Sequence, residues 1–220
     1  MSPEAFPDLE TLILAGEACP SELAGRWAEG RRVFNAYGPT EATVCATMMD
    51  CNEPWNHHRP SPPIGRTIDN FQLYILDSQL EPVPIGVPGE LHIGGVGVAR
   101  GYLNRPALTE EKFIPNPFGE GRLYKTGDLA RYILSPEKEL GNPSTGSGHR
   151  IEFLGRIDHQ VKLRGFRIEL GEIESLLEQH AAVQQAVAIV REDGLGAGSQ
   201  QLVAYVVLRE QEGEAKEELQ

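Results

Sequence analysis

The segment from Asn35 to Glu41 has the clearest chemical potential in the sequence. It reads Asn-Ala-Tyr-Gly-Pro-Thr-Glu after an apolar run, so we expect a strand that ends in a Gly-Pro turn and exposes the following residues at a sheet edge. Tyr37 offers a flat face for stacking on a purine, Thr40 a hydroxyl for a phosphate, and Glu41 a hard oxygen for Mg²⁺. The alternative is an ordinary turn in which Thr40 caps a helix.

Two later segments carry charged groups in patterns that suit a nucleotide. In Tyr124–Asp128 the final carboxylate can accept hydrogen bonds from both hydroxyls of a ribose, because its two oxygens match a vicinal diol. The stretch 155–174 packs four cations into a strand-turn pattern that would present some of them on one face: Arg156, Lys162, Arg164 and Arg167. The alternatives are a surface turn for the first segment and a solvated charged hairpin for the second.

Two other patterns do not support the chemistry that they first suggest. The glycine-rich stretch 89–103 lacks the Lys-Ser/Thr of a phosphate loop and no helix pattern starts there, so we interpret its glycines as tight barrel turns. Cys45, Cys51, His57 and His58 do not have the spacing of zinc ligands. We therefore interpret Cys45 as a buried small residue.

Hydrophobic periodicity predicts the elements that would position these residues. Residues 9–14 and 33–36 read as buried strands on either side of a helix at 21–30. Beyond a loop, short β-like runs between Gly and Pro predict a small barrel or curled antiparallel sheet. The loop covers residues 52–63. The sheet has predicted strands at 71–76, 90–93 and 96–99, followed by a helical turn at 109–113. The later predicted parts are a loop at 135–149, a hairpin at 161–163 and 166–168, an amphipathic helix at 171–181, strands at 186–190 and 202–208 with a turn at 194–198, and a polar tail at 210–220.

Composition excludes several classes of partner and location. Asp and Glu number 32 and Lys and Arg 20, and the net charge of -12 argues against nucleic acid and anionic membranes as partners. No run of about 18 apolar residues predicts a membrane span, and the first residues lack a secretory pattern. Three cysteines are too few for a disulfide scaffold, so we expect a cytoplasmic protein.

The order and spacing of these segments resemble the adenylation domains of nonribosomal peptide synthetases, within the adenylate-forming enzyme superfamily. The resemblance runs from Leu9 to Leu208. Acyl-CoA synthetases and luciferases of the same superfamily usually have Pro at the position of Leu170 and lack the Gln-Val-Lys-x-Arg-Gly-x-Arg run at 160–167. The resemblance therefore favours the amino-acid-activating branch, with an acyl- or aryl-CoA ligase fragment and a noncatalytic nucleotide-binding remnant as alternatives.

The resemblance implies an α/β fold with a β-barrel subdomain. Residues 1–157 would form the C-terminal half of the large adenylation subdomain, with the end of a sheet at 1–60 and a barrel-like part at 61–157 that carries the inserted loop 135–149. Residues 158–220 would begin the small, mobile α+β subdomain.

The resemblance also assigns roles at the nucleotide. Asn35 would hydrogen-bond adenine and Tyr37 would stack on it. Thr40 would touch the α-phosphate of ATP, and Glu41 would hold Mg²⁺. These last two would act in catalysis.

Other roles concern the ribose, the moving domain and the substrates. Asp128 and Arg156 would hold the ribose, Asp158 would be the hinge of the small subdomain, and Gly165 would line the tunnel for the carrier's phosphopantetheine arm. The amino-acid pocket would include small or apolar residues: Ile13, Ala15, Ala36, Val44 and Cys45. Their small volume and lack of charge predict a hydrophobic amino acid, with an aromatic one such as phenylalanine favoured.

In this family an amino acid carboxylate attacks the α-phosphate of ATP and expels pyrophosphate, and the adenylate then passes its acyl group to a carrier-protein thiol. The family's phosphate-covering loop that ends in Pro-Lys-Gly, its pocket Asp and its Asn-Gly-Lys catalytic lysine do not occur in this sequence. We therefore expect the isolated chain not to complete the reaction, and we expect the carrier domain to lie in the same longer polypeptide.

Overall fold

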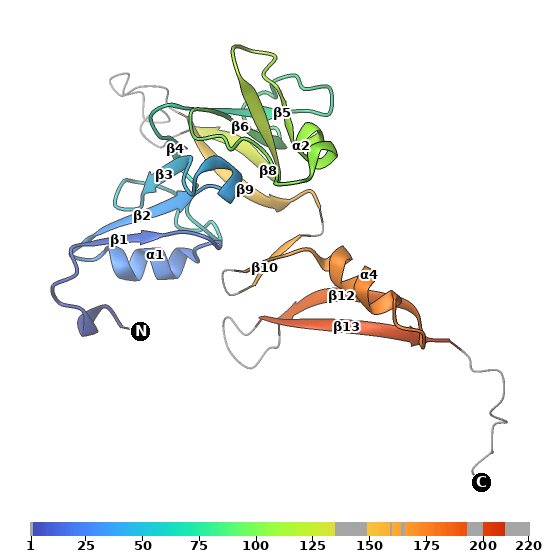
Figure 1. Cartoon of the computed structure of the whole chain (residues 1–220). Coiled ribbons are helices and arrows are strands. Elements are labelled where there is room, and N and C mark those ends of the chain that lie inside the picture. Colours follow the sequence, from blue (N-terminus) through green and yellow to red (C-terminus); the bar gives the residue numbers. More distant parts are fainter. Residues whose placement is uncertain (1, 135–148, 159, 164–165, 193–199, 210–220) are drawn as a thin grey trace, which may run out of the picture. The chain divides into compact units, whose positions relative to one another are not determined.

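The computed structural model describes residues 2–134, 149–158, 160–163, 166–192 and 200–209. The chain divides into two compact units, unit 1 from Met1 to Asp158 and unit 2 from His159 to Gln220 (Figure 1). The predicted turn at 194–198, the predicted tail at 210–220 and all but the last residue of the predicted loop 135–149 lie outside the described residues.

Unit 1 begins with a mixed four-stranded sheet in the order β1-β2-β3-β4. Strand β1 pairs with β2 in parallel, and the other two pairs are antiparallel. Its strands are β1 (Thr11–Leu14), β2 (Arg32–Tyr37), β3 (Thr47–Asp50) and β4 (Arg66–Thr67), and its short helices are η1 (Pro3–Ala5), α1 (Ser21–Ala28) and η2 (Thr40–Ala42).

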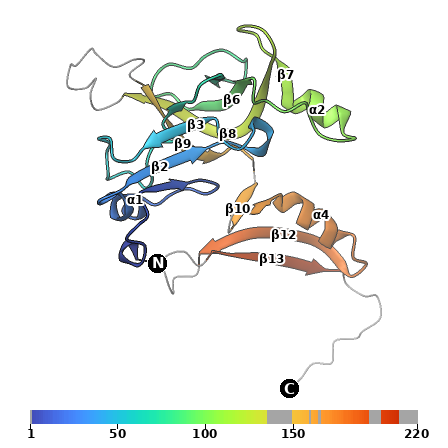
Figure 2. The same cartoon turned by 60° about the vertical axis from the view of Figure 1, so that its left-hand side comes forward.

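Helix α1 forms the parallel connection between β1 and β2 and covers one face of this sheet (Figure 2). Trp27 and Ala24 of the helix pack with Val33 and Met49, which point to the same face because side chains alternate along a strand. Ala24 and Val33 have no exposed surface, so this small core fixes the position of β2.

The second sheet of unit 1 has five antiparallel strands in the order β5-β6-β8-β7, with β9 also paired to β8. Strand β8 has 13 residues, and β7 pairs with its first part while β9 pairs with its last part. The elements are β5 (Phe71–Leu76), β6 (Gly89–Gly95), α2 (Pro106–Lys112), β7 (Phe113–Pro115), β8 (Arg122–Leu134) and β9 (His149–Arg156).

The two sheets of unit 1 meet through backbone hydrogen bonds and a shared core. Ile64 N–H donates to the Ile151 carbonyl at 2.8 Å, and Ile151 N–H donates to the Gly65 carbonyl at 2.8 Å. The core between the sheets includes Tyr37, Ile64, Leu91, Ile93 and Ile151. The end of β2 is thereby fixed against the second sheet.

Unit 2 has two hairpins and one helix. In the second hairpin Val183 pairs with Leu208, and the Glu174 and Glu178 carboxylates of the helix accept hydrogen bonds from strand N–H groups at 2.9 and 3.2 Å. The elements are β10 (Val161–Leu163), β11 (Phe166–Ile168), α4 (Leu170–Glu178), β12 (Val183–Glu192) and β13 (Gln200–Leu208).

The structure confirms the predicted α/β class with a second, antiparallel sheet. The strand predicted at 96–99 is wrong, because Val96 N–H donates to the Asn70 carbonyl and Val98 N–H to the Gly95 carbonyl, which makes a turn after β6. The helix predicted at 171–181 begins one residue earlier and ends at Glu178, and the apolar Val183 that extended its pattern starts β12 instead.

No helix in the described part of the chain combines the length and the apolar character that crossing a membrane requires.

Candidate functional site

The end of β2 places Tyr37 against the second sheet of unit 1. Alternation along β2 points Asn35 and Tyr37 to one side of the strand and Ala36 to the other. The Tyr37 hydroxyl donates a hydrogen bond to Asp128 Oδ2, and its ring centre lies 6.2 Å from that of Phe153 with a tilt of 37°. Burial, together with the neighbouring Asp128 carboxylate, raises the pKa of Tyr37 well above its ordinary value, so the phenol stays a hydrogen-bond donor.

Asp128 is the centre of a polar cluster that the register of β8 and β9 builds. Asp128 is the pairing partner of Arg156 across the two strands, and Arg156 Nη1 donates to Asp128 Oδ1 at 2.7 Å. The same guanidinium binds Asp158 as a fork, with 2.6 Å from Nε to Oδ1 and 2.6 Å from Nη2 to Oδ2. Asp128 is 3% exposed, so a fixed cation rather than bulk water balances its charge. Four residues singled out in the sequence therefore meet here: Tyr37, Asp128, Arg156 and Asp158.

Thr40 and Glu41 begin the turn η2 directly after the Gly-Pro pair. Pro39 occupies the position before the turn and no side chain caps it, so the interpretation of Thr40 as a helix cap is wrong. Thr40 is exposed, whereas Glu41 is 8% exposed. The two residues after η2, Thr43 and Val44, have φ angles of 50° and 71°, a left-handed region that residues other than glycine rarely adopt. Backbone of this kind is concentrated at functional sites.

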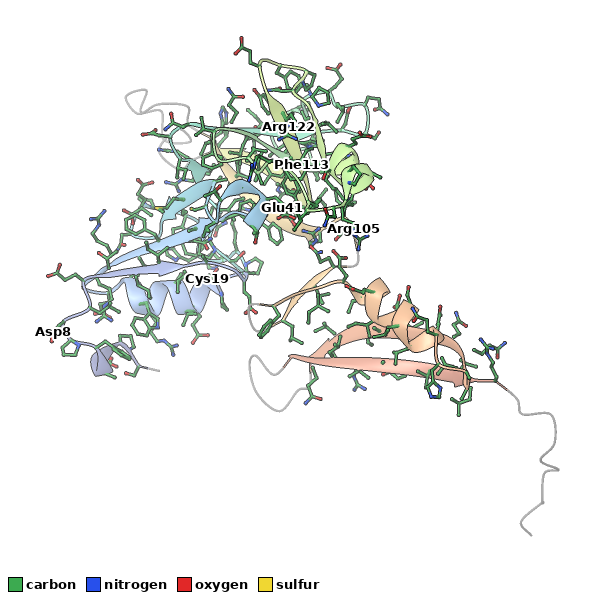
Figure 3. The ribbon with its side chains drawn as sticks, viewed as in Figure 1. Asp8, Cys19, Glu41, Arg105, Phe113 and Arg122 are labelled. Carbon is green, nitrogen blue, oxygen red and sulfur yellow. The ribbon has the colours of Figure 1, made fainter. Side chains whose placement is uncertain are left out.

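The sequence analysis missed the tyrosine that contacts Glu41. The Tyr102 hydroxyl donates to Glu41 Oε1 at 2.6 Å, and its ring lies edge-on to that of Phe113 at 5.5 Å. Glu41 and Phe113 are labelled in Figure 3. The buried Tyr124 hydroxyl lies 3.5 Å from the Tyr102 hydroxyl. Burial and then the Glu41 hydrogen bond raise the pKa of Tyr102 far above its ordinary value. A single Tyr near the end of the glycine-rich stretch 89–103 is the only signal in the sequence, and it indicates no chemistry alone.

Asn35 contacts the loop that precedes β4. The residue is 5% exposed, and Nδ2 donates to the carbonyl oxygens of Pro62 and Pro63 at 3.3 and 3.0 Å. The amide group therefore ties the end of this loop to β2, a structural role that the sequence analysis did not predict.

The predicted amino-acid pocket residues lie at one end of the first sheet and differ in exposure. Ile13 pairs with Phe34, so Ile13 and Ala36 point to the face of the sheet away from α1. Ala36 is 7% exposed, whereas Ile13 is 57% exposed and Ala15 is exposed. Cys45 is half-buried, and the interpretation that it is a buried small residue is wrong. The two left-handed residues before it direct this part of the chain to the surface, where Val44 is 74% exposed.

The residues singled out in unit 2 are described only in part. Gly165, the predicted tunnel residue, and the cation Arg164 lie outside the described residues. The backbone register of β10 and β11 pairs Lys162 with Arg167.

The environment of Glu41 suits a magnesium ion bound mainly by a nucleotide. Within the described ranges, no group of three or more His, Cys, Asp or Glu side chains could hold a metal without other ligands. Mg²⁺ is commonly held by one or two carboxylates together with phosphate oxygens and water. One carboxylate in η2, beside the exposed Thr40, fits that arrangement, and the buried Glu41 is the residue that would provide it.

The cysteines provide a test of this local geometry. Burial, followed by the nearby Cys19, raises the pKa of the Cys51 thiol to about 12, and burial also raises the pKa of Cys19 and Cys45. At pH 8 about one Cys51 thiol in 10⁴ is then ionised. We expect iodoacetamide to modify the half-buried Cys45 first, and Cys19 and Cys51 only in urea, as measured by peptide mass spectrometry.

A Cys45→Ser variant serves as the control for this labelling. This variant should lose the rapid modification at position 45 and keep the urea-dependent modification of Cys19 and Cys51. Rapid labelling of Cys51 in the folded chain would contradict the burial of its side chain.

The sequence of the chain is similar to those of known proteins. Residues 2–103 match the model of the AMP-binding enzyme family. A linear gramicidin synthase protein from Brevibacillus parabrevis is 58% identical over 204 residues, which cover 92% of this chain and 4% of that protein. The chain thus spans a small part of the curated relative that it matches.

Two solved structures have a similar fold. PA1221, a nonribosomal peptide synthetase protein with adenylation and carrier domains, superposes with a TM-score of 0.76 at 27% identity, covering 95% of this chain and 40% of that one. The Vibrio cholerae adenylation domain AlmE, solved with glycyl-adenosine-5'-phosphate, gives a TM-score of 0.74 at 30% identity over 96% of this chain and 38% of that one.

Proposed function

Since the chain belongs to the AMP-binding enzyme family, as part of a peptide-synthetase adenylation domain, we propose that it holds the adenosine and the α-phosphate of ATP while an amino acid is activated. The observation that carries this proposal is the cluster of Tyr37, Asp128 and Arg156, joined by hydrogen bonds at the end of β2. It combines an aromatic ring, a carboxylate and a guanidinium, which are the groups that a nucleoside needs.

The ribose binds at Asp128 and Arg156 in this proposal. A carboxylate can accept hydrogen bonds from two neighbouring hydroxyls, and each of its oxygens has two lone pairs. The Asp128 oxygens already accept from Tyr37 and Arg156, which fix the plane of the carboxylate before the ribose arrives. Preorganised acceptors of this kind bind more tightly because less side-chain freedom is lost on binding. Asn35 and Tyr37 then contact the adenine.

The phosphate side of the site is the turn η2. The exposed Thr40 hydroxyl donates to the α-phosphate, and Glu41 is the carboxylate that holds Mg²⁺. A bound Mg²⁺ supplies positive charge that offsets the charge of the phosphates. The contribution of this chain's own residues is to hold the α-phosphate at a fixed distance from the attacking carboxylate.

The amino acid lies on the face of the first sheet away from α1. Ile13, Ala15 and Ala36, with Val44 and Cys45 beside them, offer apolar surface and no charge. We propose a hydrophobic amino acid, with an aromatic one favoured, since the two alanines leave room for a large side chain.

The acyl group then passes to the phosphopantetheine thiol of a carrier domain. The similarity to PA1221, which contains both an adenylation domain and a carrier domain, supports this step. Asp158 acts as the hinge in this proposal.

Two measurements on this 220-residue chain test the proposal. We expect calorimetry to show binding of AMP that is at least about tenfold tighter than binding of adenine, because the charged cluster contributes only when a ribose and phosphate are present. Amino-acid-dependent ATP–pyrophosphate exchange is measured in parallel. AMP binding without exchange supports a nucleotide-holding role for this segment alone, and absence of AMP binding contradicts the proposal.

The preference for one amino acid over others is tested separately, with the complete polypeptide that the gene encodes. Pyrophosphate exchange with a panel of amino acids should be fastest with phenylalanine or another large apolar side chain. Preference for a charged or small amino acid would contradict the proposed pocket. Activation of acids that lack the α-amine would favour the acyl- or aryl-CoA ligase alternative.

A further inference from the structure

We propose that Tyr102 is a positioning residue that aims the Glu41 carboxylate at the metal-bound phosphates. This inference rests on the proposed role of Glu41. The contact that suggests it is the 2.6 Å hydrogen bond from the Tyr102 hydroxyl to Glu41 Oε1. The donor and the acceptor are 61 residues apart, so the contact depends on the tertiary fold.

The loop that carries Tyr102 binds Glu41 at two points. Its Ala99 N–H donates to the Glu41 carbonyl at 2.8 Å, and its Tyr102 hydroxyl binds the Glu41 side chain. The same loop is anchored to the second sheet, since Arg122 donates to the carbonyls of Ala99 and Arg100, each at 3.1 Å. The backbone carbonyl and the carboxylate of Glu41 are therefore both held by one loop, which is anchored to the second sheet.

Tyr102 itself is held in place at its backbone and at its ring. Its N–H donates to Thr109 Oγ1 at 2.9 Å, and the Thr109 hydroxyl donates to the Arg105 carbonyl at 2.8 Å. Its ring packs against Phe113, whose own ring lies 5.0 Å from that of Tyr124. A tyrosine fixed at both points can define the position of its hydroxyl.

Glu41 needs such a guide because its local backbone gives little support. The turn η2 has three residues and is followed by the left-handed pair Thr43 and Val44. A glutamate side chain has several rotatable bonds and loses much freedom when it is fixed for binding. A hydrogen bond to an ionised carboxylate is stronger than one between neutral groups, so a single phenol can select one orientation.

The test uses Tyr102→Phe, which removes the hydroxyl and keeps the ring. The affinity for ATP is measured by calorimetry with Mg²⁺ and with EDTA, and the affinity for AMP is measured without metal. We expect Tyr102→Phe to reduce the gain in ATP affinity that Mg²⁺ provides by about fivefold to tenfold. AMP affinity should stay within about twofold, because the ribose cluster is unchanged.

Two further variants separate the possible outcomes. Glu41→Gln measures the full effect of the carboxylate on the magnesium dependence, and Tyr132→Phe removes a hydroxyl that donates to the Leu73 carbonyl, a group outside the cluster around Glu41. If Glu41→Gln weakens the magnesium dependence while Tyr102→Phe behaves like Tyr132→Phe, the inference is overturned and the role of Glu41 stands. If Glu41→Gln changes nothing, the proposed metal role fails and the inference fails with it.

A fourth variant covers the case in which Tyr102→Phe lowers the unfolding temperature. Thr109→Val removes the oxygen that binds the Tyr102 N–H and leaves the phenol present. It should reduce the magnesium dependence by a smaller factor in the same direction. An unchanged magnesium dependence in a folded Thr109→Val chain would show that this anchoring is not needed and would contradict the inference.

Discussion

Replacing Asp128 with alanine is expected to destabilise unit 1 by about 3 kcal/mol and to weaken AMP binding by about 100-fold or more. Asp128 is 3% exposed, and its carboxylate accepts hydrogen bonds from both Tyr37 and Arg156. Its removal leaves a buried phenol without this acceptor and takes a carboxylate away from the Arg156 guanidinium. The same change removes the two oxygens proposed to hold the ribose hydroxyls.

Urea unfolding gives the stability change, and calorimetry gives the AMP affinity. Asp69→Ala is the matched control, because Asp69 is an exposed turn carboxylate in the same unit, and neither quantity should change. Asp128→Asn keeps the shape of the side chain and allows binding to be measured on a folded protein. Full AMP affinity in folded Asp128→Asn would mean that the ribose is held elsewhere.

Gly65→Ala is expected to destabilise unit 1 by about 4 kcal/mol or more, a loss that few single substitutions cause. Gly65 has a φ of +84°, and a Cβ there would lie 2.0 Å from the Met48 carbonyl oxygen and 2.5 Å from the Met49 nitrogen. The collision is with backbone, so a side-chain rotation cannot relieve it. Since Gly65 also accepts the Ile151 N–H, any shift would disturb the junction of the two sheets.

Gly86→Ala isolates the steric part of this effect. Gly86 has the same φ of +84°, and a Cβ there would meet no atom within 4 Å. Its replacement should cost only about 1 kcal/mol, the strain of a left-handed alanine. The difference between the two variants should lower the thermal midpoint of Gly65→Ala by roughly 10 °C relative to Gly86→Ala. Equal midpoints would show that the backbone around Met48 yields easily.

The strands and the order of the site segments could be predicted because they depend on local patterns. The alternation of Val33, Asn35 and Tyr37 marks β2, and the Gly-Pro pair marks its end. The turn at 96–99 was mispredicted as a strand because its residues are apolar and follow a glycine-rich strand. The backbone hydrogen bonds from Val96 to Asn70 and from Val98 to Gly95 form the turn, and the pattern of residue types predicts neither bond.

The contacts within the site could not be predicted from patterns. The resemblance grouped Tyr37 and Asp128 around one nucleotide, but their direct hydrogen bond depends on how the two sheets pack. The exposure of Cys45 depends on the left-handed pair before it, which residue type alone does not indicate. Tyr102 was missed for the same reason, since its partner is 61 residues away.

The contacts that hold unit 1 together join distant parts of the chain, and this affects how the protein folds during its synthesis. Tyr37 meets Asp128 across 91 residues, and Glu53 meets Arg150 across 97. Closing such long loops opposes folding until the contacts form, so we expect unit 1 to fold slowly. During synthesis at about 5–20 residues per second, β2 would leave the ribosome on the order of 10 s before Asp128. The ability to hold a nucleotide would therefore arise late and in a single step, once β9 has been made and paired with β8.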